Sequence, residues 1–138
     1  DLTMVLNGAL AGLVSITAEP LMPSLGLATI IGAIGGIIIV FSVPLLDRLK
    51  IDDVVGAISV HGIAGIWGTL AVVLSNSDTS FGTQLLGTVS ICLFTFIISY
   101  IVWLLLDRLM GARVSEESEI DGLDKTELGI EAYPDFSK

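Results

Sequence analysis

The feature that most limits the fold of this chain is a series of long apolar stretches without charged residues. The longest extends from about residue 82 to 106 and contains no Asp, Glu, Lys or Arg. An apolar helix of about 18–20 residues can cross the hydrocarbon layer of a membrane. Helices are the expected element because open strands would leave backbone groups unpaired in lipid. We therefore predict an all-α, polytopic helical membrane protein.

Prolines, charges and polar clusters divide the chain into four predicted membrane-spanning helices. The predicted spans cover about residues 2–18, 24–46, 54–74 and 82–106. Pro20 and Pro23 separate the first two spans, because two nearby prolines break a helix. Together these spans form a predicted transmembrane region over residues 1–110. The acidic remainder, 111–138, is predicted to be a cytoplasmic tail.

The basic residues predict how the four spans are oriented. Cytoplasmic loops of membrane proteins carry an excess of Lys and Arg. When four spans alternate in direction, all six basic residues fall on one side of the membrane. These residues are Arg48, Lys50, Arg108, Arg113, Lys125 and Lys138. That side is predicted to be the cytoplasmic face of a plasma or inner membrane.

The only histidine, His61, lies within the third predicted span. Ionisable groups at such depth are costly and usually face a bundle interior or a water-filled path. A neutral imidazole both donates and accepts hydrogen bonds, so it can bind an amine without placing a permanent charge in the path. Small or apolar residues at helical spacing are predicted to share its face: Ala57, Ile58, Ala64 and Gly65. A structural histidine bonded to a neighbouring helix is the alternative.

Two acidic residues, Asp52 and Asp53, precede the third span. They are predicted to cap this helix, where a carboxylate accepts free backbone N–H groups and suits the positive end of the helix dipole. The alternative is that they attract cations at a cytoplasmic mouth. Small residues four apart, as in Gly8/Gly12 and Gly32/Gly36, predict faces where helices pack closely.

Several function classes are not expected. The net charge of −9 argues against nucleic-acid binding. His61 has no second histidine or carboxylate nearby on its helix, so we expect no metal site. The sequence contains no nucleophile elbow, phosphate-binding loop or pair of catalytic acids, so we expect neither an enzyme nor a cofactor.

Three segments of the sequence carry a family resemblance. The first comprises KIDD at 50–53 and GAISVHGIAGIWGTL at 56–70, the second is NGALAGLVSITA at 7–18, and the third combines Gly122, Leu123, Asp124, Gly129 and Tyr133. The first resembles the segment of ammonium transporters that bears the second histidine of a twin-histidine pair. The second resembles another helix signature of the same family, and the third resembles its C-terminal cytoplasmic motif.

The resemblance implies a fold and a function. Members of that family have about eleven spans and form homotrimers with one pore per subunit, and this chain resembles the last four spans and the tail. The resemblance implies conduction of ammonium or ammonia, and of methylammonium, with His61 as one member of the histidine pair. The other member lies on a helix outside this chain. The tail motif implies a regulatory role and a PII-type signal protein as a partner.

Three alternatives stay open at this point. An ammonium sensor built on the same fold would carry an attached signalling domain. A Rhesus-type gas channel is a close relative with a similar fold. A plain four-helix membrane scaffold would use His61 only for packing.

Overall fold

The computed structural model describes residues 2–53 and 55–130, and among these every regular element is a helix. The chain divides into two compact units, Asp1–Cys92 and Leu93–Lys138, which are described separately. The division falls within the longest helix, α4 (Phe81–Met110). The expectation of an all-α chain is confirmed over the described residues.

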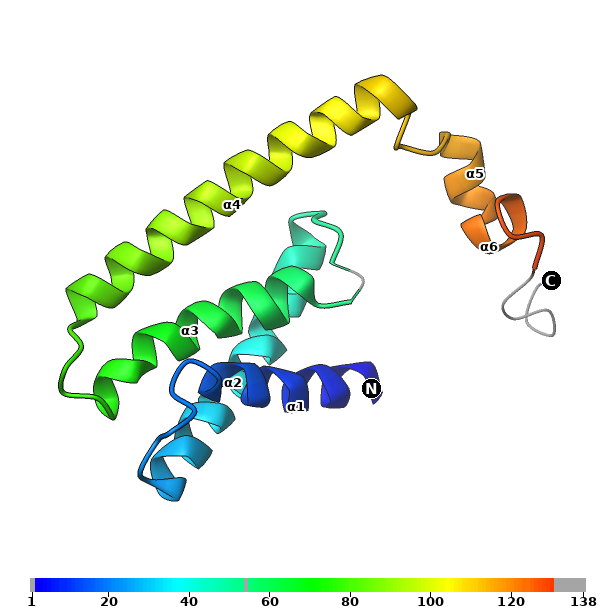
Figure 1. Cartoon of the computed structure of the whole chain (residues 1–138). Coiled ribbons are helices and arrows are strands. Elements are labelled where there is room, and N and C mark those ends of the chain that lie inside the picture. The colour runs from blue at the N-terminus through cyan, green and yellow to red at the C-terminus, as the bar shows by residue number, and fades with distance from the viewer. Residues whose placement is uncertain (1, 54, 131–138) are drawn as a thin grey trace. The chain divides into compact units, whose positions relative to one another are not determined.

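The first unit contains two helices, a composite third helix and the first part of a fourth (Figure 1). The helices are α1 (Leu2–Ile16), α2 (Leu25–Arg48), a π-helix (Ala57–Ile63) that continues into α3 (Ala64–Ala71), a 3₁₀ turn (Val72–Leu74), and the first part of α4. Ser24 caps α2, because its hydroxyl oxygen accepts the N–H of Leu27 at 3.2 Å. The helices therefore begin and end within a few residues of the predicted spans.

Glycines bring α1 and α2 into close contact. A methyl group on Gly12 would lie 3.2 Å from the carbonyl oxygen of Gly32, and one on Gly36 would lie 3.3 Å from that of Gly8. Such distances are tighter than ordinary van der Waals contact, so a methyl group at either position would push the neighbouring backbone away by a few tenths of an ångström. The prediction that these glycines form packing faces is confirmed for this pair of helices.

A small core joins α1, α2 and the composite third helix. Ala11, Ile39, Val60 and Ala64 are fully buried there. Beside them, the hydroxyl of Ser15 donates to the carbonyl of Ala11 at 2.7 Å. The core therefore fixes the helix that carries His61 against both of its neighbours.

The loops of the first unit lie at opposite ends of its helices. The Asn76 side-chain amide donates to Glu19 at 3.3 Å, so the loops after α1 and after the 3₁₀ turn lie side by side. The loop between α2 and the π-helix lies at the other end (Figure 1). Neighbouring helices therefore run antiparallel, as four alternating spans require.

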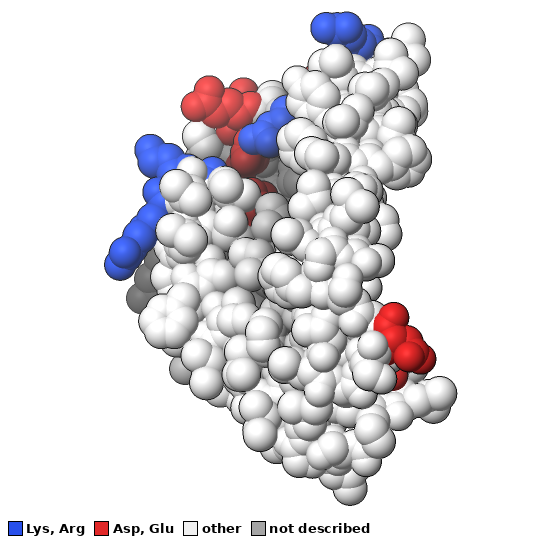
Figure 2. Space-filling view, turned by 90° about the vertical axis from the view of Figure 1, so that its left-hand side faces the viewer, with Lys and Arg blue, Asp and Glu red and all other residues white. Residues whose placement is uncertain are grey.

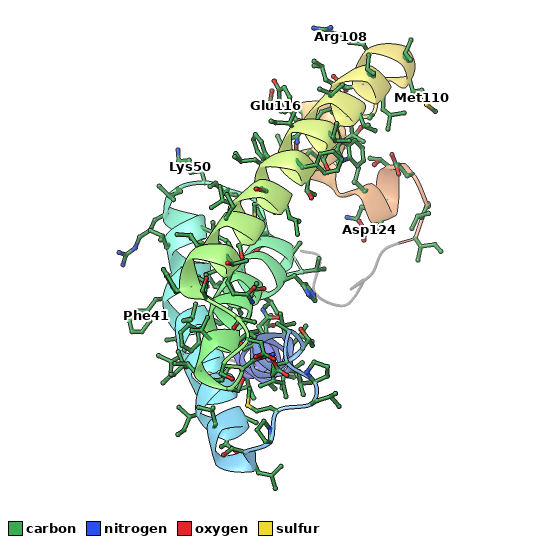
Figure 3. All side chains as sticks on the ribbon, turned by 60° about the vertical axis from the view of Figure 1, so that its left-hand side comes forward. Phe41, Lys50, Arg108, Met110, Glu116 and Asp124 are labelled. Atoms are coloured by element: carbon green, nitrogen blue, oxygen red, sulfur yellow. The ribbon has the colours of Figure 1, made fainter. Side chains whose placement is uncertain are left out.

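Most of the remaining surface is apolar. Within residues 2–53 and 55–130, three helices are long and apolar enough to cross a membrane, Leu25–Arg48, Ala57–Leu74 and Phe81–Met110, and Leu2–Ile16 is a shorter apolar helix. Charged side chains gather in a few groups, and broad stretches of the surface carry none (Figure 2). Phe41 points outward from α2 and is 71% exposed (Figure 3). This surface is that of a membrane protein, in which lipid or further helices replace water.

The second unit contains the rest of α4 followed by α5 (Glu116–Asp121) and α6 (Leu123–Thr126). Ser115 caps α5 by accepting the N–H of Ser118 at 3.2 Å. Arg113 forms an ion pair with Glu119 at 2.7 Å, but both side chains are more than half exposed, so the pair adds little stability. The acidic tail thus contains two short helices, of which α5 has a side-chain cap.

Candidate functional site

His61 lies in the π-helix that opens the third helix of the chain. The carbonyl oxygen of Gly56 accepts both the N–H of Val60 at 2.9 Å and that of His61 at 3.3 Å. Gly56 has φ of +70°, and a methyl group there would lie 2.8 Å from a side-chain carbon of Val60. The wide first turn therefore depends on a glycine at this position. Short π-helical segments occur frequently at functional sites.

The carboxylate of Asp53 stabilises the same turn by accepting hydrogen bonds from it. It accepts the N–H of Ile58 at 2.8 Å, the N–H of Ser59 at 2.9 Å and the hydroxyl of Ser59 at 2.7 Å. Partial burial by itself raises the pKa of Asp53, but the hydrogen bonds from Ile58 and Ser59 outweigh it and lower the pKa below its ordinary value of 3.8. Asp53 therefore satisfies free N–H groups at this helix start, as predicted for a cap. Asp52 is exposed beside it.

A cavity of about 470 Å³ opens beside His61 within the first unit. Residues from α1, the third helix and the start of α4 line it: Val14, Thr17, His61, Gly62, Gly65, Ile66, Thr69, Gln84, Gly87, Thr88, Ile91 and Cys92. Most of this lining is apolar or glycine, and it contains no Asp, Glu, Lys or Arg. Among the described residues that line the cavity, His61 is thus the only basic one.

The imidazole of His61 makes no hydrogen bond to any described residue, and it is exposed at the cavity. A histidine that only packs would be expected to bond a neighbouring helix, because an unpaired polar group in an apolar region is costly. In residues 2–53 and 55–130 that partner is absent. The donor and acceptor functions of the ring are therefore not used by any residue that the structure describes.

The predicted neighbours of His61 separate into two groups. Gly65 lines the cavity with it, whereas Ala64 is fully buried in the core with Ala11 and Val60. Ala57 and Ile58 are exposed and lie outside the cavity wall. On the helix of His61, the residues that share the cavity with it follow it by one, four, five and eight positions; they are Gly62, Gly65, Ile66 and Thr69. These positions form one stripe of the helix, which is turned away from the expected face because the opposite side, with Ala64, packs into the core.

Sequence reasoning missed the contribution of the fourth helix. Gln84, Thr88 and Cys92 follow each other at four-residue spacing and present one stripe of α4 to the cavity. The signal for this stripe was the regular spacing of polar or small residues, Gly87 included, in a helix that is otherwise strongly apolar.

The residues of the predicted tail motif form a turn structure in the second unit. The carbonyl of Gly122 accepts the N–H and the hydroxyl of Thr126, both at 3.1 Å, and Leu123 and Asp124 begin α6. Gly129 has φ of +65° and donates its N–H to Lys125. Tyr133 lies outside the described residues.

For metal binding, the described residues contain no group of three or more His, Cys, Asp or Glu side chains that could hold an ion. The only cysteine, Cys92, is a free thiol exposed at the cavity. A ligand of this cavity would therefore meet hydrogen-bonding side chains and the imidazole of His61.

Comparison with known proteins places this site in a family. Residues 1–133 match the Ammonium Transporter Family. A putative ammonium transporter of Methanothermobacter thermautotrophicus is 33% identical over 136 residues, which cover 86% of this chain and 33% of the relative. Ammonium transporter Amt2 of Archaeoglobus fulgidus is 34% identical, with 99% of this chain and 33% of the relative covered. A putative ammonium transporter of Synechocystis is 38% identical, with 89% and 25% covered.

The chain spans about a third of the length of the curated relatives that it matches. The matched residues 1–133 include those of α1 to α4, with Asp53 and His61. From the family match over nearly its whole length, and from relatives above 30% identity, we conclude that this chain belongs to the ammonium transporter family.

Proposed function

We propose that this chain forms part of a membrane transporter for ammonium or ammonia, and that His61 lines the path of the conducted nitrogen. The observation that carries the proposal is the unpaired imidazole of His61 at a cavity whose wall otherwise holds no basic or acidic side chain. The names of the family and of its relatives supply the substrate.

The chemistry of the site fits a small amine. A neutral imidazole can accept an N–H of ammonium through its unprotonated nitrogen. Transfer of that proton gives an imidazolium and a neutral ammonia molecule, which can enter an apolar passage at lower cost than the cation. Gly62 and Gly65 leave room beside the ring, because neither carries a side chain. A second histidine supplied by another part of the transporter would take the proton onward and complete the twin-histidine pair.

We further propose the orientation and assembly implied by the family. The loop with Arg48 and Lys50 lies at the opposite end of the first unit from the loops with Glu19 and Asn76, in keeping with a cytoplasmic position for the basic loop. The acidic tail, which includes the turn at Gly122 and Gly129, then lies in the cytoplasm. A homotrimer, a PII-type partner for this tail and a role in nitrogen metabolism complete the proposal.

The proposal is tested by replacing His61 in the complete transporter. We expect His61→Ala to change methylammonium uptake or its selectivity over potassium, because the hydrogen-bonding and proton-accepting group is lost. Ile58→Ala is the matched control, since it shortens a side chain of the same π-helix that lies outside the cavity wall. Unchanged uptake and unchanged selectivity in His61→Ala would refute the role of His61.

A further inference from the structure

A second pocket lies in the second unit, where α4 passes into the tail, and the proposed function gives it no role. Its volume is about 470 Å³, and it is lined by Trp103, Asp107, Ala112 and Arg113. We call it the junction pocket. Sites for small molecules typically measure about 300–1,000 Å³. One aromatic, one acidic and one basic side chain therefore line a space large enough for a small zwitterion.

A sharp turn after α4 brings the two charged residues of the junction pocket together. Gly111 has φ of +65° and donates its N–H to the carbonyl of Asp107 at 2.9 Å, which ends the helix. The backbone N–H of Arg113 then donates to one carboxylate oxygen of Asp107 at 3.2 Å. Within the described ranges no donor reaches the second oxygen, so this carboxylate can accept a hydrogen bond from a ligand.

Arg113 also has donors that a ligand can use. Its guanidinium pairs with Glu119 through Nη2 at 2.7 Å, and the two side chains are 74% and 54% exposed. A guanidinium has five N–H donors, and an ion pair this exposed contributes little stability. A phosphate can therefore bind Arg113 beside Glu119 or in its place, through the paired N–H groups that suit phosphate oxygens.

The sequence of α4 places the junction pocket at the edge of the lipid layer. The helix has 30 residues and is about 45 Å long, whereas the hydrocarbon layer is about 30 Å thick. Its apolar stretch ends at Asp107 and Arg108, and Trp103 lies one turn earlier and is 64% exposed. Tryptophan is enriched at this level of membrane proteins, because its ring is apolar and its N–H is polar. The pocket therefore opens where phospholipid headgroups lie.

We propose that the junction pocket binds the headgroup of an aminophospholipid, such as phosphatidylethanolamine. The phosphate pairs with the Arg113 guanidinium, the primary ammonium donates to the Asp107 carboxylate, and the glycerol end of the lipid lies against the ring of Trp103.

The charges of the pocket favour this headgroup over two others. A zwitterion matches a wall with one acid and one base, whereas an anionic headgroup would bring a negative charge to Asp107 without a cation to pair with it. A choline headgroup carries a cation but no N–H that could donate to the carboxylate. The bound lipid joins the end of α4 to the tail at Arg113. This inference concerns the membrane alone and does not depend on the transport role of His61.

Fluorescence of Trp103 reports which lipid occupies the pocket, because bromine atoms on a lipid quench a tryptophan that they contact. The complete transporter would be reconstituted in phosphatidylcholine vesicles with an equal minor share of one lipid brominated near the glycerol end of its acyl chains. Subtracting the signal of Trp103→Phe removes the other tryptophans of the transporter. We expect brominated phosphatidylethanolamine to quench Trp103 at least twofold more strongly than brominated phosphatidylcholine or brominated phosphatidylglycerol.

Matched variants assign this preference to the two charged side chains. Asp107→Asn keeps the size of the side chain but removes its charge, and Arg113→Gln removes the guanidinium, so we expect each variant to abolish the preference. Each is compared with the same variant that also carries Trp103→Phe. Arg108→Gln is the control, because it removes a cation from the same end of α4 but lies outside the pocket wall, and the preference should persist in it.

Four results would each overturn the proposal. They are equal quenching by brominated phosphatidylethanolamine and phosphatidylcholine in the wild type, stronger quenching by brominated phosphatidylglycerol, a preference that survives in both Asp107→Asn and Arg113→Gln, and no quenching of Trp103 by any of the three lipids. Methylammonium uptake by the same vesicles tests the transport role separately, so a failure of either idea is distinguishable from a failure of the other.

Discussion

The cap formed by Asp53 leads to a prediction about the turn that carries His61. Asp53→Ala removes an acceptor for the N–H groups of Ile58 and Ser59 and for the hydroxyl of Ser59. Loss of such a cap typically costs about 0.5–2 kcal/mol, and the upper half of this range applies here because three hydrogen bonds are lost together. A loss of about 1–2 kcal/mol corresponds to a factor of about 5–30 in a local opening equilibrium.

Hydrogen exchange measures this opening directly. In the complete transporter in lipid, the amides of residues 57–63 should exchange about 5–30 times faster in Asp53→Ala than in the wild type. Asp52→Ala is the matched control, because this neighbouring carboxylate is exposed and its loss removes a similar charge. Equal exchange rates in the two variants would refute the view that Asp53 stabilises the turn through its hydrogen bonds.

Three further predictions follow from the backbone and the charges. Because the pKa of Asp53 is lowered on folding, its stabilising effect should be complete above the ordinary value of 3.8 and should be lost as the pH falls through the lower folded value. The protection of residues 57–63, measured relative to the intrinsic exchange rate at each pH, should therefore fall as the pH drops below 3.8 in the wild type and stay level in Asp53→Asn. Gly56→Ala should lower the midpoint of thermal unfolding, because the left-handed backbone costs about 1–2 kcal/mol for alanine and the added methyl group would meet a valine side chain at 2.8 Å; an unchanged midpoint would contradict the strain. Gly32→Leu should destabilise the contact of α1 with α2 by about 1–3 kcal/mol, because even a methyl group there would lie 3.3 Å from the carbonyl oxygen of Gly12. The effect is measured as a fall in the midpoint of thermal unfolding. Gly82→Ala is the control, because a methyl group at Gly82 would meet nothing within 4 Å.

The helices could be predicted because hydropathy and prolines mark them clearly. Their ends could be predicted less well, because a helix does not have to end where the apolar stretch ends. The fourth span was predicted to end near residue 106, whereas α4 continues to Met110 through Asp107 and Arg108. Hydropathy reports where a chain leaves lipid, and charged residues can continue a helix into water. The first predicted span likewise reached residue 18, while α1 ends at Ile16.

The site could be predicted only in part, for reasons of backbone geometry. His61 stood out because it is a lone ionisable group in an apolar span. The π-helix left no periodic signal, since it depends on the carbonyl of Gly56 accepting two N–H groups. Ala64 was expected beside His61 from its spacing of three residues, which does not show that this side of the helix packs into the core. Gln84 was missed because its partner is a backbone carbonyl of a different helix, which sequence spacing does not reveal.

The central claim, that His61 lines the path of the conducted nitrogen, is tested most directly in proteoliposomes. The complete transporter would be reconstituted around a pH-sensitive dye, and an inward gradient of ammonium or of potassium would be applied. We expect His61→Ala to change the response to ammonium at least tenfold, or to pass potassium faster than the wild type does. An ammonium response and a potassium response both equal to those of the wild type would contradict it.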